Sequence, residues 1–331
     1  MSIPGRGIVM SQDYNETGID ERLQQSPEPH RARRRELLKA FPQLRQLIGP
    51  DPRTACWIAL VWIMQIGIAF GVAAQPWWAI AGAAYAIGAI AALALWALLH
   101  EASHDLVFRS TIANHWTGIV ASLPLVIPVA EPFRKYHRLH HRYQGDAVLD
   151  ADVASAWECR LVRNSPLRKA LWLAAFPLLQ SLRPARMKGI DLFDHRAAAN
   201  VALQLAFDAV IVWWLGWGAL AYLLLSNLFA LGLHPLGARW IQEHFEMRPG
   251  QETYSYYGPL NRLVFNAGMH VEHHDMPQIA WSRLPQLRKI ADRHYAELYS
   301  HRSWTQLLLR FLLDPSITLE SRTIRQTRHV S

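Results

Sequence analysis

Charged residues are absent from one long stretch of the chain. No Asp, Glu, Lys or Arg occurs between Thr54 and His100, a length that is too great for one membrane-spanning helix and right for two of about 20 residues. The segment QPWW at 75–78 divides the stretch, because proline breaks helices and the two tryptophans are typical of membrane interfaces. The pattern predicts a tight helical hairpin with spans over residues 55–74 and 77–99.

A second apolar block extends from residue 201 to residue 236. The segment WWLGWG at 213–218 marks a turn at its midpoint, since it combines glycines with interfacial tryptophans. The block predicts two further spans, over about 199–216 and 219–236. A buried hairpin of a soluble protein is the alternative, but the uncharged length and the tryptophans at both turns favour a membrane.

One charged residue, Asp208, interrupts the second block. A carboxylate at this depth is costly unless it meets a polar partner, so we expect it to point into the helical bundle. Two roles stay open for it. It could hydrogen-bond to Ser226 or Asn227 on the neighbouring span, or it could bind a hydroxyl or amide of a lipid substrate.

Lys and Arg are distributed unevenly around the predicted spans. They are frequent before the first span, between the hairpins and after the last span, whereas both hairpin turns carry no charge. Basic residues near span ends are retained in the cytoplasm. Residues 1–53 are therefore expected to form a cytoplasmic basic arm, and residues 54–331 a membrane domain whose helical cap, 100–198 and 237–331, lies on the same side. The predicted fold is all-α, an integral membrane protein with four spans.

Shorter elements are expected in the arm and in the cap. Amphipathic helices are predicted over 33–48, 282–300 and 304–313. Prolines interrupt the apolar segment 105–130, which favours an interfacial or re-entrant path, and segment 166–183 is expected to lie on the membrane surface.

Composition narrows the class of partner. The chain has 331 residues, a net charge of +8 and 51% hydrophobic residues, and its basic residues adjoin the predicted spans, where they favour anionic lipids over nucleic acid. Cys56 and Cys159 show neither a disulfide nor a metal-binding pattern. The first 50 residues lack the apolar run of a cleavable signal peptide. Abundant arginine and alanine favour a bacterial inner membrane, with the endoplasmic reticulum as the expectation for a eukaryotic source.

Three histidine boxes dominate the chemistry: HEASH at 100–104, HRLHH at 137–141 and HVEHH at 270–274. They hold eight of the sixteen histidines, and the two later boxes share one H-x-x-H-H spacing. Imidazole is a metal ligand at neutral pH, and helical residues three or four apart share a face. A lone histidine pair is more often a packing feature, but the threefold repeat predicts a centre with two metal ions.

A site of neutral imidazoles leaves its metals more electropositive than a carboxylate site, which suits a strong oxidant that removes hydrogen from an unactivated C–H bond. Carboxylates also lie in or beside the boxes. Glu101, Asp105, Glu272 and Asp275 are expected either to orient imidazoles through the distal N–H or to be solvated at the membrane surface.

These boxes, placed around two helical hairpins, resemble those of the membrane fatty-acid desaturase and hydroxylase superfamily. Segments 232–245 and 252–291, which include YSYYGPLN, are further similar to the sphingolipid delta-4 desaturases that act on dihydroceramide. Segments 33–52 and 133–153 match the same family, so the resemblance covers nearly the whole chain. Val271 departs from it, because most members carry Asn at that position.

The resemblance implies a centre of two Fe ions that uses O2 and two electrons from a separate donor protein, of the cytochrome b5 or ferredoxin type, to introduce a trans double bond into a long-chain base. The arginine-rich cytoplasmic face would attract an acidic donor. The implied iron ligands are His100, His104, His137, His140, His141, His270, His273 and His274, with His244 as the ninth. His234 is a candidate tenth ligand or a capping residue, and Asn266 a weak ligand or a donor to one. Asp208 would then contact the sphingoid head group.

Other functions stay open at this stage. A hydroxylase or an acyl-chain desaturase of the same superfamily would carry the same boxes, because ligand spacing does not reveal the fate of the carbon radical. A more distant alternative is a non-catalytic membrane protein with a structural zinc cluster.

Overall fold

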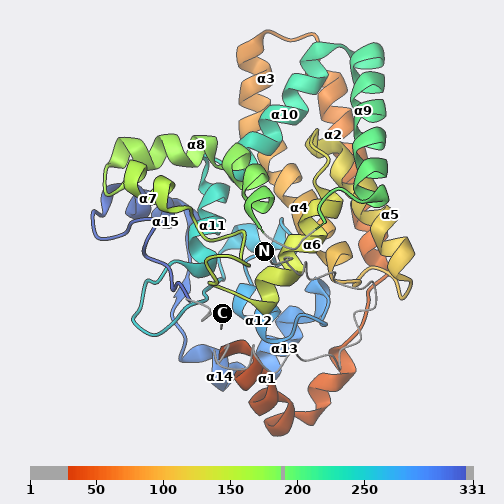
Figure 1. Ribbon diagram of the computed structural model, residues 1–331. Coiled ribbons are helices and arrows are strands. Elements are labelled where there is room, and N and C mark those ends of the chain that lie inside the picture. Colours follow the sequence, from red (N-terminus) through yellow and green to blue (C-terminus); the bar gives the residue numbers. More distant parts are fainter. Residues whose placement is uncertain (1–28, 188–190, 326–331) are drawn as a thin grey trace, which may run out of the picture.

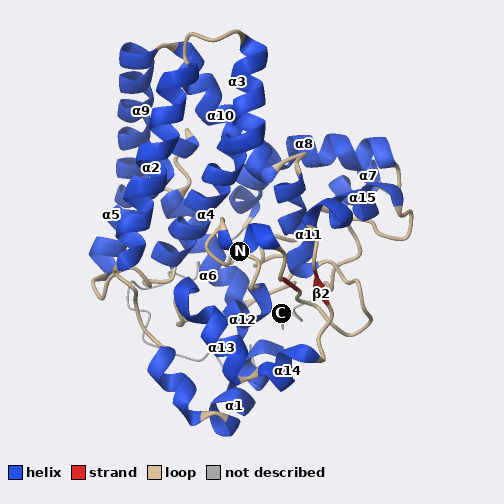
Figure 2. Cartoon of the chain, turned by 180° about the vertical axis from the view of Figure 1, so that it is seen from behind, coloured by secondary structure: helices blue, strands red, loops and turns tan. Residues whose placement is uncertain are grey.

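The computed structural model describes residues 29–187 and 191–325, so residues 1–28 of the expected basic arm and residues 188–190 of the central loop lie outside the described ranges. Within them the chain is mostly helical, and its one regular strand pair is short and parallel, formed by β1 (Ser255–Tyr256) and β2 (Ser300–His301). Figure 1 shows an upright bundle of long helices standing on a cap of shorter ones, and Figure 2 places the strand pair within the cap.

The first hairpin forms where the uncharged stretch predicts it. Helix α2 (Arg53–Val72) is followed by α3 (Trp77–Ala83), a π-helical turn η3 (Ala84–Gly88) and α4 (Ala89–Ser103), which continue one another. A Cβ at Gly88 would collide with the side chain of Ser226, so glycine here lets the two hairpins approach closely. The second span extends beyond the predicted residue 99, and the first histidine box therefore begins inside a helix.

The second hairpin consists of α9 (His195–Leu215) and α10 (Trp217–Leu231), joined at Gly216 with a positive φ of 85°. The predicted span over 219–236 is too long at its end. After Leu231 the chain bends by 48° into the turn η6 (Pro235–Gly237) and helix α11 (Ala238–His244), because Pro235 has no N–H to continue the helix.

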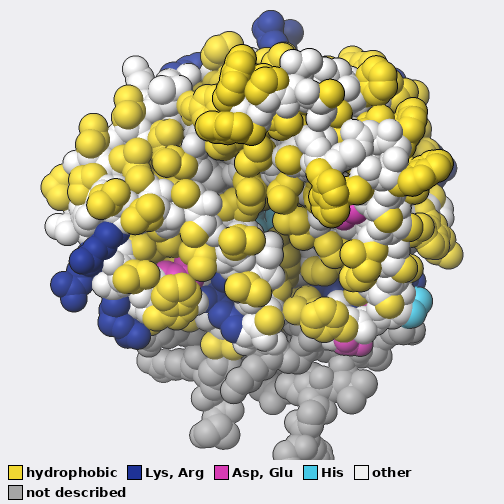
Figure 3. Space-filling model, turned by 90° about the horizontal axis from the view of Figure 1, so that it is seen from above, with side chains coloured by type: hydrophobic (Ala, Val, Ile, Leu, Met, Phe, Trp, Pro, Cys, Tyr) yellow, Lys and Arg dark blue, Asp and Glu magenta, His cyan; other side chains and the backbone are white. Residues whose placement is uncertain are grey.

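Within the described ranges, three helices are long and apolar enough to cross a membrane, and the number rises to five if each of two bent helix pairs is one span. Only 22% of the apolar window of α2 and 17% of that of α9 is buried inside the protein. Trp77 at one hairpin turn is 80% exposed and Trp213 at the other is 86% exposed. Figure 3 shows the hydrophobic surface at this end of the bundle, which a lipid environment explains.

A sharp break separates α5 (Thr111–Ser122) from α6 (Ala130–Arg142), which are related by a bend of 112° across the turn η4 (Leu123–Leu125). The prolines in segment 105–130 predict this interruption. The second hairpin donates to two backbone carbonyls at the break: Gln204 Nε2 to that of Leu123 at 2.9 Å and Asn227 Nδ2 to that of Leu125 at 3.0 Å. The Leu123 carbonyl also accepts from the Val126 N–H at 3.1 Å. Non-helical backbone is thereby tolerated inside the bundle.

The cap surrounds the cytoplasmic ends expected for the long helices. Its further elements are α1 (Pro29–Ala40), η2 (Pro42–Leu47), α7 (Ala156–Val162), α8 (Pro166–Leu182), η5 (Arg183–Arg186), η7 (Pro259–Arg262), α12 (His270–Asp275), η8 (Trp281–Arg283), α13 (Leu284–Ile290), α14 (Asp292–Ala296) and α15 (Trp304–Leu313). A buried apolar cluster that includes Leu37, Leu44, Met276 and Leu287 joins the N-terminal helix to the C-terminal part of the cap.

Two of the amphipathic segments are broken rather than continuous. The helix predicted over 33–48 ends at Ala40 and resumes as the 3₁₀ turn η2, which has Pro42 at its start. The helix predicted over 282–300 divides into α13 and α14 at Ala291, which is fully buried and lies outside the helical conformation. The segments predicted over 166–183 and 304–313 agree with α8 and α15.

The contact between the hairpins and the break can be tested at Asn227. Its Oδ1 accepts a hydrogen bond from Trp96 Nε1 at 2.8 Å, and its Nδ2 donates to the Leu125 carbonyl. Asn227→Leu therefore leaves the indole N–H of Trp96 and the carbonyl of Leu125 without these partners. Each buried unpaired group costs about 1–3 kcal/mol, and we expect a clearly lower thermal unfolding midpoint in detergent. The adjacent Ser226→Ala is the control, because Ser226 Oγ donates only within its own helix, to the Tyr222 carbonyl. Equal midpoints for the two variants would contradict this role.

Candidate metal centre

The three histidine boxes meet beneath the helical bundle and form two sets of imidazoles. Set 1 comprises His100, His104, His137, His141 and His273. Set 2 comprises His140, His244, His270 and His274. Within each set one ring nitrogen of every member lies within 4.8 Å of the others. The structure thus brings together all nine histidines that the sequence singles out as ligands.

Helical spacing divides each of the two H-x-x-H-H boxes between the two sets. On α6, His137 and His141 are one turn apart and face set 1, whereas His140 faces set 2. On α12 the same spacing works in the opposite sense, with His270 and His274 in set 2 and His273 in set 1. Each H-x-x-H-H box therefore ties both sets together.

The remaining ligands complete the two sets from different helices. The end of α4 supplies His100 and His104 to set 1. Set 2 receives His244 from the last position of α11. The bend between α10 and α11, which shortens the predicted fourth span, is what turns this histidine towards the other boxes.

The spacing between ring nitrogens fits a shared cation. In set 1, Nε2 of His137 lies 3.0 Å from Nε2 of both His104 and His141. In set 2, Nε2 of His244 lies 3.1 Å from Nε2 of His140 and 3.0 Å from that of His270. Nitrogens that share one ion at about 2.0–2.1 Å per bond lie about 3 Å apart when their bonds are at right angles.

His274 gives a second test of the fit. Both of its ring nitrogens are buried, and neither has a hydrogen-bond partner among the described residues. Its ring stacks on that of His141, with centroids 4.1 Å apart. An imidazole buried in this way is stabilised by a metal ion on its nitrogen, since an unpaired buried polar group is otherwise costly.

Burial also sets the protonation state of these ligands. It lowers the pKa values of His270, His273 and His274 well below the ordinary histidine value, and the neighbouring imidazoles lower them further. The rings are therefore neutral at physiological pH, each with a nitrogen lone pair available for a cation.

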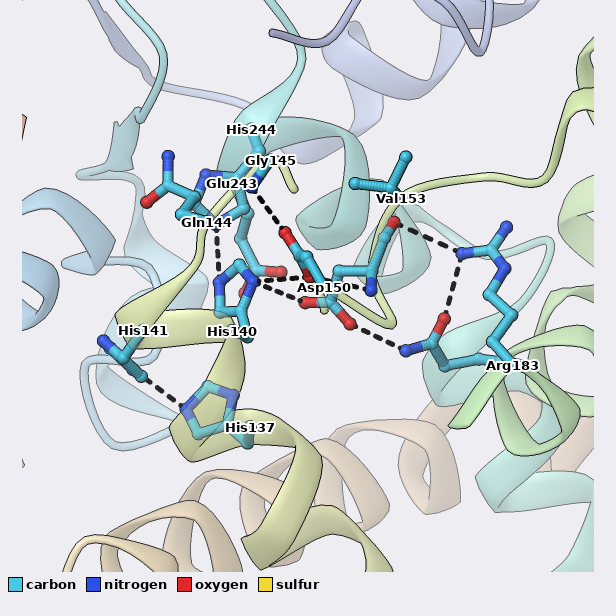
Figure 4. Close-up of polar contacts among 12 residues, drawn as sticks. His137, His140, His141, Gln144, Gly145, Asp150, Val153, Arg183, Glu243 and His244 are labelled. Atoms are coloured by element: carbon cyan, nitrogen blue, oxygen red, sulfur yellow. Dashed lines mark hydrogen bonds and ion pairs between the residues drawn. The ribbon is translucent and has the colours of Figure 1, made fainter. Parts of the chain in front are cut away.

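Asp150 orients one ligand, and the sequence analysis missed it. Its Oδ1 lies 3.0 Å from His140 Nδ1, while Oδ2 of Asp152 lies 3.4 Å from the same nitrogen (Figure 4). Burial acts to raise the pKa of Asp150, but His140 and Arg322 outweigh it and hold this pKa below its usual range. The ionised carboxylate accepts a hydrogen bond from Nδ1–H of His140, and Nε2 of the same ring is directed at the other members of set 2. A loop that returns on itself after α6 makes this contact, and box spacing does not reveal such a return.

The four carboxylates that were expected either to orient imidazoles or to be solvated at the membrane surface have other main partners. Glu101 accepts from the backbone N–H of Trp281 at 2.9 Å and lies 3.7 Å from His100 Nδ1. Asp105 pairs with Arg134 and Arg138 at 2.6 and 2.7 Å.

The other two carboxylates lie on α12. Glu272 accepts from Ser255 Oγ and Tyr257 OH, each at 2.6 Å. Asp275 lies 2.6 Å from Nδ1 of His30, which is not a member of either set. Both carboxylates therefore hold α12 in place rather than orient a ligand.

Two weaker ligand candidates, His234 and Asn266, lie apart from the two sets. His234 accepts from the backbone N–H of Leu236 through Nδ1 and packs on Tyr85, which is the capping role. Asn266 donates to the Trp281 carbonyl at 3.1 Å and borders the cavity beside the histidines.

The hydrogen bond expected between Asp208 and Ser226 or Asn227 is wrong. The carboxylate of Asp208 accepts instead from Gln204 of its own helix at 2.9 Å, while Ser226 and Asn227 bond to other groups. Gln204 is one helical turn away and already directed at the break in the chain, which makes it the nearer donor.

His30 links the N-terminal helix to the metal centre, a role that a lone histidine in a basic segment does not signal. Besides its contact with Asp275, its Nε2 lies 2.9 Å from Thr253 Oγ1, and that oxygen lies 3.4 Å from His244 Nδ1. Its ring centroid is 5.0 Å from that of His274. Helix α1 therefore closes the centre on the side away from the bundle.

A cavity of about 100 Å³ lies between the bundle and the two sets. His100, His137 and His273 of set 1 and His140 and His270 of set 2 border it. Leu93, Trp96, Phe133, Phe176 and Leu231 form an apolar side, whereas Asp152, Gln180, Arg239 and Glu243 form a polar one. The arrangement can hold an alkyl segment directly beside two bound cations.

Comparison with known proteins agrees with this geometry. Residues 75–310 match the fatty acid desaturase family model, and residues 24–53 match that of the sphingolipid Delta4-desaturase. A rice protein named sphingolipid delta(4)-desaturase DES1-like is 39% identical over 90% of both chains. The Drosophila melanogaster sphingolipid delta(4)-desaturase DES1 is 39% identical over 91% of this chain and 94% of its own.

A rat protein named sphingolipid delta(4)-desaturase/C4-monooxygenase DES2 is 38% identical over 92% of this chain and 94% of its own. The matched range 75–310 includes all three histidine boxes and the second predicted hairpin. The chain belongs to the sphingolipid delta(4)-desaturase family of fatty acid desaturases and is an oxidoreductase.

Proposed function

We propose that this chain introduces a delta-4 double bond into the long-chain base of a sphingolipid of the dihydroceramide type, with one Fe ion held by each histidine set. The observation that carries the proposal is the common cavity, which is lined by histidines of both sets and by apolar side chains. The names of the relatives support the substrate class.

The reaction removes two hydrogens from neighbouring methylenes and, with O2, two electrons and two protons, yields the double bond and two molecules of water. The irons would supply O2 activation. The protein residues place the chain: neighbouring methylenes are chemically alike, so the position of the double bond follows from which of them the cavity walls hold beside the two sets. Trp96, Phe133 and Phe176 exclude water from this segment.

We further propose a membrane arrangement for the chain. Helices α2, α3 with α4, α9 and α10 would be the four spans, and the cap with both termini would lie in the cytoplasm. The electrons would come from a separate acidic donor of the cytochrome b5 or ferredoxin type that binds the basic cytoplasmic face. Eukaryotic relatives favour the endoplasmic reticulum for this chain, and the bacterial inner membrane stays a prediction from composition.

Hydroxylation at C4 is a second candidate activity, because the rat relative is named for both reactions. The two outcomes separate when the carbon radical either loses a second hydrogen or gains oxygen. Mass analysis of long-chain bases from a host that expresses the chain distinguishes a product that has lost two hydrogens from one that has gained an oxygen.

Metal analysis tests the centre itself. We expect purified protein to hold two irons, and His141→Ala in set 1 or His274→Ala in set 2 to lower the iron content and abolish desaturation, because each removes a ligand without altering a span. His195→Ala is the control, since His195 is exposed at the start of α9. One zinc per chain, or full iron content in both ligand variants, would refute the proposed di-iron centre.

Topology is tested by cysteine labelling in a background that lacks Cys56 and Cys159. Pro76→Cys lies in an exposed hairpin turn and Ala147→Cys in an exposed part of the central loop. In intact bacterial cells an impermeant maleimide should label the first variant, whereas the second should need permeabilised cells. The opposite labelling would place the cap outside the cytoplasm.

A further inference from the structure

One side of the cavity carries charged groups that an alkyl chain does not need. We call Asp152, Gln180, Arg239 and Glu243 the polar wall. Asp152 lies in the loop after α6, Gln180 on α8, and the other two on α11. Asp152, Gln180 and Glu243 are buried, so these groups are removed from bulk water and face the space that the substrate would enter.

Hydrogen bonds hold the polar wall in place. Gln180 Nε2 donates to Asp152 Oδ1 at 2.8 Å, and Arg183 Nη1 donates to Gln180 Oε1 at 3.0 Å. On α11, Arg239 is paired with Glu243 through a short contact one helical turn apart. Figure 4 shows Glu243 beside His140, and Arg183 farther from this histidine, beyond Asp150.

The polar wall lies against the metal centre. Asp152 Oδ2 is 3.4 Å from His140 Nδ1, and Glu243 Oε1 is 3.6 Å from His270 Nδ1. Both histidines belong to set 2. A polar group of the substrate that binds this wall would therefore lie within a few ångströms of the reacting carbons.

Sphingolipid chemistry requires such a neighbour. In a long-chain base the delta-4 double bond begins at the carbon next to the one that carries the C3 hydroxyl, and the amide nitrogen is on C2. At about 1.5 Å per carbon–carbon bond, the head group cannot be far from the metals. A desaturase that acts in the middle of an acyl chain has no polar group at this distance, and buried charges would then face methylenes at a cost.

We propose that the polar wall is the subsite for the hydroxyl and amide groups of the long-chain base. The carboxylates of Asp152 and Glu243 accept from the hydroxyls, and the amide of Gln180 and the guanidinium of Arg239 donate to the acyl carbonyl. The proposal rests on the proposed function and adds the residues that recognise its substrate. Gln180 also fixes the Asp152 carboxylate, so it is a positioning residue as well as a donor.

The test compares two substrates with the purified, iron-loaded enzyme and its donor: a short-chain dihydroceramide and the analogue that lacks the C3 hydroxyl. A hydrogen bond to a charged group is worth about 1.5–3 kcal/mol, so we expect the enzyme to prefer the hydroxylated substrate by about 10- to 100-fold in kcat/KM. Gln180→Met and Asp152→Asn should each lower this preference by about fivefold or more. In both variants the kcat/KM of the hydroxylated substrate should fall by a larger factor than that of the analogue.

Two controls make the result specific. Ser181→Ala, next to Gln180, should change neither substrate, because Ser181 Oγ donates to the Pro177 carbonyl of its own helix. Asp208→Asn tests the alternative head-group site on α9, and a lowered preference in this variant would overturn the assignment to the polar wall.

The possible outcomes separate the subsite from the activity. An unchanged preference in Gln180→Met and Asp152→Asn, with iron content retained, overturns the subsite even when dihydroceramide is desaturated. A purely structural defect would lower both substrates equally and also counts against it. If one of the two variant proteins does not accumulate in the host, the substrate preference of the other variant decides whether the polar wall is the subsite. Absence of desaturation of either substrate by the unmodified enzyme would instead refute the proposed function.

Discussion

The close approach of nine imidazoles is the constraint on which the rest of the structure depends. Their facing nitrogens lie as little as 3.0 Å apart, and burial lowers the pKa values of ligands such as His270 and His273, whereas Asp150 and Asp152 act to raise the pKa of His140. Wherever both facing nitrogens carry lone pairs, these repel one another until a cation binds them. Four helices must therefore be held together by contacts outside the two sets, so that a site for the metal exists before it arrives.

Carboxylates provide these contacts, and they do so by fixing helices rather than single rings. Asp105 follows the first box and binds Arg134 and Arg138, which joins the end of α4 to α6. Glu272 joins α12 to the segment of β1 through Ser255 and Tyr257. Asp150 is the exception, since it acts on the ring of His140 itself.

The N-terminal helix takes part in the same scheme. Asp275, the last residue of α12, binds both His30 and Arg33 of α1, so the third box is held from the cytoplasmic side expected for the cap. This contact gives a physical role to the start of the segment that matches the sphingolipid Delta4-desaturase model. The basic arm predicted from charge alone is thus, in its described part, a structural element of the metal centre.

Local periodicity explains which features the sequence could predict. Uncharged length revealed the hairpins, and box spacing revealed the ligands, because both depend on residues within one helix. The partners of Asp150, His30 and Asp275 depend on where distant segments return, which no local pattern records. The end of α10 was misplaced for a related reason: residues 232–236 remain apolar, but Gly232 and Pro235 redirect them into the cap.

A second change of chain direction, between α5 and α6, explains why polar residues occur inside the second hairpin. The 112° break between α5 and α6 turns the second histidine box towards the site, but it leaves the Leu123 carbonyl with only a 3₁₀ bond from Val126 and the Leu125 carbonyl without a backbone donor among the described residues. Gln204 of α9 and Asn227 of α10 satisfy these carbonyls, and Asp208 holds the amide of Gln204. Through Gln204, Asp208 is thus connected to a break some eighty residues earlier in the chain. The break that positions the second histidine box is thus stabilised by polar side chains of the membrane helices, which links the geometry of the metal centre to the polarity of these helices.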